Sequence, residues 1–432
     1  MPDQLRHDMR QARRASGMGW AAFARASGFG VAYLRNVENG NRRVTESVAA
    51  AYDRVLETGG SFAAALAATG PVDVSWNQAG ATLAVLTSLM EGRRVDRRGF
   101  LAAGVALSAS TNNWVTAIGR TLLEPRAAFV DGASLLAGLE GRLNLLRHVD
   151  DELGSGEVFT AARSDLALAV AAIKSRRYKG DHLARLYAIT TEAARQVGWA
   201  AFDQGRVGLA QSYFDASLRA SAECGDVIAG AYTLSFAAIQ CYSSPGLASR
   251  AVSFTDTART QVRGRSTPRM EAMLAARAAR SWSKGGAKEE TKHQLHLARA
   301  ALDKGRCEDD PSFLYWVDYG EIEMIAGSSA LELGDPAEAL RRFEAGMQAY
   351  PGDEQYPRSH AIYLARAAEA HLALHDLDAA VATGRHAAAC LGAVDSARSA
   401  SQLRGLCQKL APHTAHAGVR DFLEARQPQK FA

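Results

Sequence analysis

The sequence predicts an all-α protein, in which a small N-terminal helical bundle is followed by a long α-solenoid of paired helices. Its 432 residues are too many for one ordinary hydrophobic core, so more than one domain is expected. Hydrophobic residues make up 47% and charged residues 22%, which is typical of a globular chain. Alanine is abundant and aromatic residues make up only 7%. Because alanine favours helices and lets them pack closely, the composition indicates helix throughout.

Positive charge is concentrated near the N-terminus. Between residues 4 and 43 the chain has eight arginines against two acidic residues, Asp8 and Glu38, although the net charge of the whole chain is only +4. A basic module on a nearly neutral body is the pattern expected where only that module meets phosphates.

Four short helices are expected in this basic segment. Apolar residues at helical spacing predict one helix from Leu5 to a stop at Gly17 and three more over residues 20–26, 31–39 and 45–57, with Thr45 as the cap of the last. Helices of this length are not stable alone, so they must share a core. The candidates for that core are Trp20, Phe23, Ala24, Leu34, Val37 and Tyr52.

Residues 23–45 resemble the helix-turn-helix of the phage-repressor (Cro/C1 or XRE) family. The family pattern has an alanine in the second helix, a glycine at the turn, an apolar pair in the recognition helix and a Glu-x-Gly-x-Arg motif. Here these positions are Ala24, Gly28, Leu34 with Val37, and Glu38 to Arg42. The resemblance implies a DNA-binding domain over residues 1–60. It departs at Gly19-Trp20, where the family has a small polar cap and a glutamine, which puts a phosphate contact there in doubt.

The third helix has an outward face, because Leu34 and Val37 must point into the core. An α-helix fits the major groove of DNA and reads base edges with such a face. By the resemblance, the base-reading residues are Val31, Ala32, Arg35 and Asn36. The phosphate contacts are Arg25, Asn39, Asn41, Arg42 and Arg43, and Arg13 forms a structural ion pair with Glu38.

Residues 61–155 are expected to form a helical linker or a dimerisation region, and the first hairpins of the array are a further alternative. Helices are predicted over residues 81–92 and 131–149. Residues 96–102 resemble a twin-arginine export motif. Because such signals act at N-termini and this one lies inside the chain, the segment is interpreted as the start of a helix.

Residues 156–427 are expected to form successive antiparallel helix pairs. The clearest unit matches the tetratricopeptide consensus at Gly327, Gly334-Asp335, Ala339, Phe343 and Pro351. Two further units match at Gly198, Gly205, Ala210 and Phe214, and at Ala368, His375-Asp376 and Ala380. The turns expected at residues 205, 246, 286, 334 and 375 are 40 to 48 residues apart. The basic period of this repeat is about 34 residues, so a tetratricopeptide-like solenoid with longer helices is predicted.

Such pairs stack into a right-handed superhelix whose first helices line a concave surface. A groove with charged, amide and aromatic groups suits an extended peptide, whose backbone amides need partners. The consensus register assigns ten residues to this surface: Arg195, Trp199, Asp203, Thr233, Gln240, Arg280, Glu321, Met324, Ser328 and Glu369.

Sequence motifs for catalysis, metals or cofactors were not found. Glycine-rich phosphate loops, GxSxG and HExxH are absent, the five cysteines have no CxxC spacing, and the pair His371 and His375 lacks a third convergent ligand. The chain has neither an N-terminal signal nor an apolar run long enough for a bilayer. We therefore expect a cytoplasmic protein that is not an enzyme and uses no cofactor, metal or membrane.

An XRE-type domain followed by tetratricopeptide repeats is similar to the peptide-sensing quorum regulators of the Rgg/PlcR/PrgX type. The resemblance implies a homodimer on a pseudo-palindromic operator in double-stranded DNA, whose two heads move when a short peptide binds in the groove. Three alternatives stay open. The effector is a small diffusible molecule; the repeats bind a partner protein and no signal, as in a repressor or scaffold; or the N-terminal bundle binds protein instead of DNA.

Overall fold

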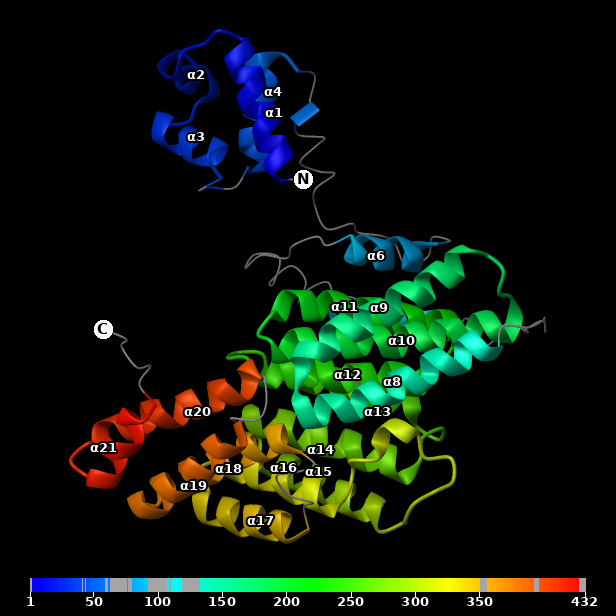
Figure 1. Cartoon of the computed structure of the whole chain (residues 1–432), viewed down its shortest axis with the longest axis vertical. Coiled ribbons are helices and arrows are strands. Elements are labelled where there is room, and N and C mark those ends of the chain that lie inside the picture. The colour runs from blue at the N-terminus through cyan, green and yellow to red at the C-terminus, as the bar shows by residue number, and fades with distance from the viewer. Residues whose placement is uncertain are drawn as a thin grey trace. The chain divides into compact units, whose positions relative to one another are not determined.

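The structure is a computed structural model that describes residues 2–40, 42, 44–58, 61–62, 76, 80–91, 107–108, 110–115, 117–118, 133–349, 356–391 and 396–426. Within these residues the regular elements are α-helices and short 3-10 helices (Figure 1), so the predicted all-α fold is confirmed. The chain divides into two compact units, Met1–Ser75 and Trp76–Ala432.

The first unit contains the four predicted helices, which are α1 (Pro2–Ala15), α2 (Trp20–Ser27), α3 (Val31–Glu38) and α4 (Glu46–Leu56). Their apolar faces meet in one core, in which Phe23, Leu34, Val37 and Tyr52 are completely buried. Trp20 was also predicted in the core, but it is only partly buried at its edge.

Two local features fix how these helices begin and end. Gly28 has a left-handed backbone with φ of 79°, and its N–H donates to the carbonyl of Ala24, which ends α2. A glycine at this position adopts that backbone without strain. At the start of α4, Oγ1 of Thr45 accepts a hydrogen bond of 3.3 Å from the backbone N–H of Val48, which is the predicted helix cap.

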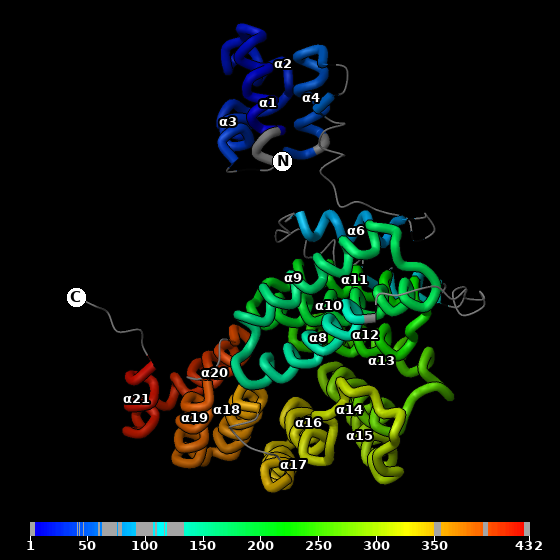
Figure 2. The backbone as a smooth tube through the Cα atoms, turned by 45° about the vertical axis from the view of Figure 1, so that its right-hand side comes forward, coloured from blue at the N-terminus to red at the C-terminus, as the bar shows by residue number. Residues whose placement is uncertain are grey.

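The second unit consists mainly of helices packed in consecutive pairs, as expected for an α-solenoid (Figures 1 and 2). Five pairs follow one another: α10 (Gly180–Asp203) with α11 (Val207–Cys224), α12 (Val227–Tyr242) with α13 (Ala248–Val262), α14 (Pro268–Lys284) with α15 (Lys288–Leu302), α16 (Tyr319–Glu332) with α17 (Pro336–Ala349), and α18 (Pro357–Ala373) with α19 (Leu377–Leu391). The 3-10 helix η1 (Ser312–Leu314) precedes α16, and α20 (Ala397–Leu410), η2 (Ala411–His413) and α21 (Ala417–Glu424) follow the last pair.

The turn inside each pair lies at the predicted residue. All five turn residues have a left-handed backbone, with φ between 63° and 77°: Gly205, Gly246, Gly286, Gly334 and His375. Four of them are glycine, which reaches this conformation freely, so the chain reverses within a few residues.

Glycines also permit close crossing of two helices within a pair. A β-carbon on Gly198 would lie 2.8 Å from ring carbons of Phe214, and a β-carbon on Gly327 would lie 2.8 Å from the ring of Phe343. Both glycines are on the first helix of a pair and both phenylalanines are buried on the second. The small residues predicted at the crossings are therefore required by the packing.

The described parts of the connection between the bundle and the pairs pack on the array. Helix α6 (Ala81–Met90) contacts α11 and α9 (Ser155–Lys174), and α8 (Ala133–Leu153) contacts α9 and α10. The buried Trp114 donates a hydrogen bond of 2.8 Å from Nε1 to Oγ of Ser221. The resemblance to an export motif at residues 96–102 lies outside the described residues, as does Pro351.

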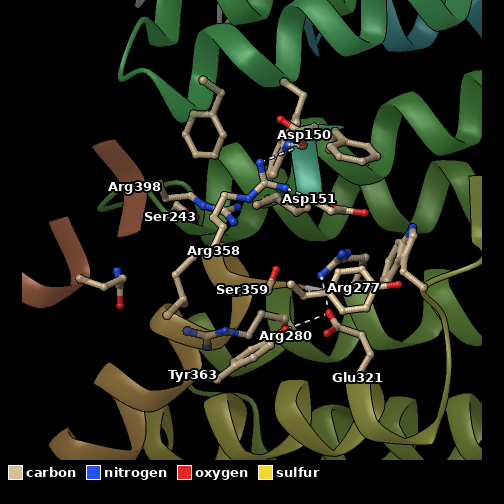
Figure 3. Close-up of a pocket in the computed structure, with 18 of the residues that line it drawn as sticks. Asp150, Asp151, Ser243, Arg277, Arg280, Glu321, Arg358, Ser359, Tyr363 and Arg398 are labelled. Carbon is tan, nitrogen blue, oxygen red and sulfur yellow. Dashed lines mark hydrogen bonds and ion pairs between the residues drawn. The ribbon is translucent and has the colours of Figure 1, made fainter. Parts of the chain in front are cut away.

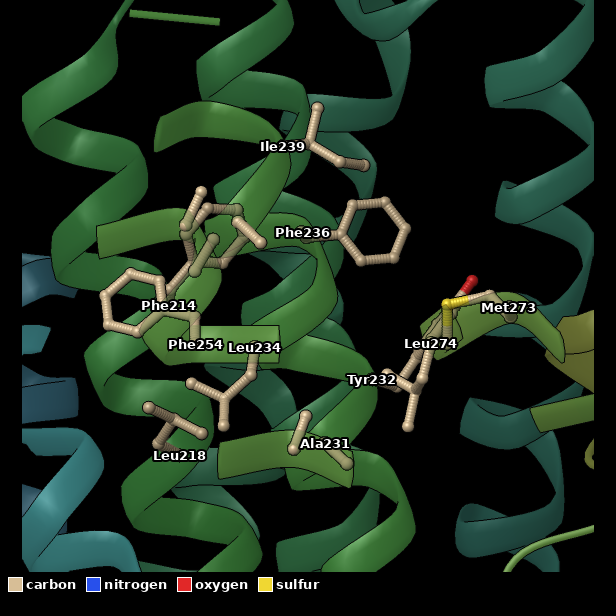
Figure 4. Close-up of a cluster of buried hydrophobic side chains, with 14 of the residues drawn as sticks. Phe214, Leu218, Ala231, Tyr232, Leu234, Phe236, Ile239, Phe254, Met273 and Leu274 are labelled. Carbon is tan, nitrogen blue, oxygen red and sulfur yellow. The ribbon is translucent and has the colours of Figure 1, made fainter. Parts of the chain in front are cut away.

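The largest core of the second unit lies between α10, α11, α12, α13 and α14. Figure 4 shows Phe214, Leu218, Leu234 and Phe254 gathered between neighbouring helices of this region. The two ends of the array also meet, because α18 contacts α8 and α20 contacts α10. The first helices of the pairs thus surround a common interior.

Candidate functional site

Helix α3 carries one buried and one outward face, as the spacing of its apolar residues predicted. Leu34 and Val37 are completely buried. On the other side, Ala32 and Arg35 are exposed, and Val31 and Asn36 are half-buried, with Val31 packed against the edge of the core. The face assigned to base reading is therefore accessible, most fully at Ala32 and Arg35.

A buried ion pair holds α3 against the rest of the first unit. Arg13 on α1 donates from Nε and Nη2 to the two carboxylate oxygens of Glu38, at 2.7 and 2.9 Å. Tyr52 on α4 donates to the same carboxylate at 2.8 Å. The hydrogen bond to Glu38 raises the pKa of Arg13, and burial followed by the nearby Glu38 charge raises that of Tyr52. Three helices thus meet at one carboxylate.

Trp20 occupies the place where the XRE-type pattern that this segment resembles has a glutamine. The guanidinium of Arg13 lies 3.7 Å from the centre of its ring, and that of Arg35 lies 5.5 Å from it. The indole therefore links the buried ion pair to the exposed arginine of α3 through cation–π contacts.

Most residues assigned to phosphates surround α3 at the surface. Arg25, Asn39 and Arg42 are exposed. The guanidinium of Arg42 lies 5.2 Å from the ring of Tyr33, which limits where it can reach. The remaining two, Asn41 and Arg43, lie outside the described residues.

The second unit contains a cavity of about 430 Å³ in its interior. Its wall comes mainly from α8 and from the first helices α10, α12, α14, α16 and α18, together with α20 and the segment before α16. Eight arginines line it, against four acidic residues. Figure 3 shows Arg277, Arg280, Arg358 and Arg398 with the acidic side chains around this space.

Five of the ten residues predicted on the concave surface line this cavity: Arg195, Trp199, Arg280, Glu321 and Ser328. They lie on α10, α14 and α16. The prediction that first helices of the pairs form the inner surface therefore agrees with the fold.

The other five predicted residues lie elsewhere. Oγ1 of Thr233 is 2.8 Å from Oγ of Ser217 on α11, and Gln240 donates to the carbonyl of Val207 at 2.8 Å. Met324 is buried against α17. Two more make ion pairs and do not line the cavity: Asp203 with Arg398 and Glu369 with Lys409.

Several residues that line the cavity were not predicted from the sequence. On α12 the inner face carries Tyr232, Phe236 and Tyr242. Tyr232 is one position from the predicted Thr233, and Tyr242 is two positions from the predicted Gln240. Phe236 follows Tyr232 by four positions, which places both on the same side of the helix. Five arginines on α14, α18 and α20 were also not predicted: Arg277, Arg358, Arg366, Arg398 and Arg404. The sequence pattern that could have identified these lining residues is the recurrence of an arginine or an aromatic residue on the first helix of successive pairs.

Two of the cavity arginines are closely matched by carboxylates. Arg195 donates from Nε and Nη2 to Glu192 at 2.8 and 2.7 Å. Nη1 of Arg358 lies 2.8 Å from Asp150, and its Nη2 lies 3.6 Å from Asp151. Burial raises the pKa of Asp151 to about 6, although Arg358 opposes the shift.

Glu321 on α16 is a further buried carboxyl group in the wall of the cavity. Tyr363 donates to its Oε1 at 2.8 Å, and Nη1 of Arg277 lies 3.9 Å from the same oxygen. Burial raises the pKa of Glu321 to about 7, because the arginine and the hydrogen bond only partly compensate for lost hydration. This group therefore changes charge near neutral pH.

Among the described residues, groups of three or more histidine, cysteine or acidic side chains that could hold a metal ion are not found. None of the helices described is long and apolar enough to cross a bilayer.

A helix-turn-helix domain family matches residues 4–66 of the chain, the segment that contains α1 to α4. No curated protein matches the chain. The first unit is thus a helix-turn-helix domain, followed by a large region of paired helices. A domain of this kind indicates DNA binding and transcription regulation.

Proposed function

We propose that this chain is a DNA-binding transcription regulator, in which α3 reads bases and the second unit binds an effector. The observation that carries the proposal is the exposed face of α3, held by the Arg13–Glu38 ion pair inside a segment that matches a helix-turn-helix family. A recognition helix must be rigidly oriented while its outer side chains stay accessible. Arg35 is the residue best placed to contact a base edge.

The phosphate contacts are assigned to Arg25, Asn39 and Arg42, with Asn41 and Arg43 completing the set. Arginine and asparagine side chains beside a recognition helix fix its register on the duplex without reading sequence. Binding is therefore expected to weaken steeply as salt concentration rises.

Sequence-specific DNA binding can be tested without knowing the operator. The full chain is used at low salt to select the duplexes that it binds from a random-sequence library. The wild type is expected to enrich one motif. Arg35→Ala should then bind the enriched duplex about 10-fold to 100-fold more weakly, since one lost base contact has that effect. Arg341→Ala, which removes an exposed arginine on α17, is the matched control and should bind normally. A wild type that enriches no sequence would overturn the proposal, and so would full affinity in Arg35→Ala.

We further propose that two copies bind together. Two recognition helices in a symmetric dimer reach half-sites about 10 base pairs apart, so the enriched motif should be an inverted repeat with that spacing. A single unrepeated half-site would contradict the dimer while leaving DNA reading intact.

The size of the cavity favours a small molecule as the effector over the short extended peptide that the family resemblance implied. A cavity of about 430 Å³ is within the usual range for small-molecule sites, about 300–1,000 Å³. Its wall combines α8 and α10 with α18 and α20, so an occupant contacts both ends of the array. Such an occupant can change how the array closes, which is what an effector requires.

A further inference from the structure

The arginines of the cavity differ in how well they are neutralised. In contrast to Arg195 with its two short hydrogen bonds, Nε of Arg398 lies 3.6 Å from Asp203. Among the described residues, Arg366 has no carboxylate within ion-pair distance, and it donates only a long hydrogen bond of 3.4 Å to Gln402. These guanidinium groups retain donors that their neighbours do not use.

Arg280 shows the same shortage of acceptors. Its Nη1 donates to Ser283 at 2.9 Å, and its Nη2 lies 3.3 Å from Glu332, but that carboxylate is also 2.7 Å from Lys284. Its Nε has no hydrogen-bond partner, although the residue is only 3% exposed. A buried donor without a partner is unfavourable unless something else satisfies it.

A hydroxyl group in the same wall is also unsatisfied. Ser328 is 2% exposed and its Oγ has no hydrogen-bond partner. Ser328 and Arg280 both line the cavity. Because they come from neighbouring inner helices, α16 and α14, one bound group can satisfy donors of both.

Aromatic rings hold guanidinium groups of the cavity wall in place. Arg398 lies 4.5 Å from the ring centre of Trp199, and Arg277 lies 5.0 Å from that of Trp316. Stacking on a ring fixes the plane of a guanidinium while its N–H groups remain available at the edges. The cavity thus presents oriented cationic donors between flat apolar surfaces.

We propose that the cavity binds a small organic anion, a carboxylate or phosphate attached to a planar ring. Its acidic group is held by Arg280, Arg366 and Arg398, and its ring lies against the aromatic side chains of the wall. Guanidinium forks match the oxygens of carboxylates and phosphates, and Arg280, Arg366 and Arg398 retain donors that the surrounding carboxylates do not use. This inference specifies the effector class and rests on the proposed effector-binding role of the second unit.

A pair of fluorescent probes tests the proposal on the full chain. The first is 1-anilinonaphthalene-8-sulfonate, a ring system with one fixed negative charge. The second is N-phenyl-1-naphthylamine, the same ring system without that charge. We expect one molecule of the anionic probe per chain, bound at least about 10-fold more tightly than the neutral one. Arg366→Gln should abolish this preference, and Arg366→Lys should retain part of it.

The source of the anionic group is then identified by competition. Adenosine 5′-monophosphate and benzoate are added separately to the complex with the anionic probe, and displacement by one of them distinguishes a phosphate from a carboxylate. Arg341→Gln, a charge loss on the outer helix α17, is the control and should bind the probe like the wild type.

Equal affinity for the two probes in the wild type, or an unchanged preference in folded Arg366→Gln, would overturn the proposal. Circular dichroism establishes whether the variant is folded. Because Arg366 lies in the second unit, Arg366→Gln should still bind the duplex selected by the wild type. Loss of probe binding with intact DNA binding separates this inference from the DNA-binding proposal.

Discussion

Ser396 donates a hydrogen bond of 2.9 Å to Oδ1 of Asp203, which lies 193 positions earlier in the chain. The carboxylate of Asp203 is completely buried and also accepts a hydrogen bond of 3.1 Å from Ser155. Arg398 lies 3.6 Å from it. The start of α20 is therefore tied to the end of α10, and the array closes beside the cavity.

Asp203→Ala should loosen this closure. Removing the carboxylate takes away one shared acceptor of Ser396, Ser155 and Arg398, which should lower the free energy of local opening of α20 by about 1–3 kcal/mol. Hydrogen exchange measured by mass spectrometry over residues 397–410 should become faster. Lys409→Ala is the matched control on the same helix, because its ion pair with Glu369 is exposed and such pairs contribute at most about 1 kcal/mol. Equal exchange in the wild type and Asp203→Ala would show that this contact does not close the array.

Local features of the array were predicted from sequence because they depend on neighbouring residues. The turns at Gly205 and Gly334 need a left-handed backbone, and the crossings at Gly198 and Gly327 leave no room for a side chain. Each requirement selects a residue type at a fixed offset, so it is visible in one sequence.

The inner face was predicted less well because its register is sensitive to single residues. Thr233 and Gln240 were assigned to it, whereas the lining residues next to them are Tyr232 and Ile239. A shift of one position turns a side chain by about 100° around a helix, which moves it from the cavity to the interface with a neighbouring helix. Because the repeats are longer than the tetratricopeptide consensus, the consensus register did not identify the inner-face positions of α12 correctly.

The closure of the array could not be predicted. The ion pair of Arg358 with Asp150 joins α18 to α8, and its existence depends on the curvature accumulated over all intervening pairs. No local pattern encodes that sum. For the same reason the arginines Arg277 and Arg366 were not recognised as neighbours of one cavity.

Gly327→Ala should destabilise the second unit. The new methyl group would lie 2.8 Å from the ring of the buried Phe343, and overpacking of this kind costs about 1–3 kcal/mol. The midpoint of urea unfolding should fall. Gly138→Ala is the matched control, because Gly138 is exposed on α8 and a β-carbon there meets nothing within 4 Å. That variant should gain up to about 1 kcal/mol from helix propensity. Unfolding midpoints that change alike in both variants would refute the crossing contact.

Glu38→Ala should loosen the first unit without touching DNA directly. It leaves the buried guanidinium of Arg13 without its counter-charge and the hydroxyl of Tyr52 without its acceptor. Breaking a buried pair in this way typically costs about 3–5 kcal/mol. Hydrogen exchange should become faster in α1 and α3, and DNA affinity should fall with it. Arg25→Ala is the contrasting variant, since exposed Arg25 should affect DNA affinity but leave exchange as in the wild type. Slow exchange retained in Glu38→Ala would mean that the network does not hold α3.

Glu321 should make the stability of the second unit depend on pH. Burial raises its pKa from 4.5 to about 7, opposed by Arg277, Tyr363 and Arg398 and assisted by Asp318. Between these two values the folded state binds more protons than the unfolded state, so this group's contribution to stability is lost as pH rises towards 7. Glu321→Gln removes the titration. The variant should gain up to about 3 kcal/mol relative to the wild type between pH 5 and pH 8, measured as urea unfolding at both values. A difference that is the same at both pH values would contradict the shift.

The same titration should appear in anion binding. Above pH 7 the ionised Glu321 faces Arg277 and reduces the positive potential of the cavity, whereas below it the neutral acid does not. Since 1-anilinonaphthalene-8-sulfonate remains charged throughout, its affinity for the wild type should fall between pH 6 and pH 8. In Glu321→Gln the affinity should fall much less over that range, because only Asp151, whose pKa burial raises to about 6, still ionises at its lower end. The neutral probe should show no trend in either protein. A parallel fall in the wild type and the variant would assign the pH dependence to another group and exclude Glu321 as its cause.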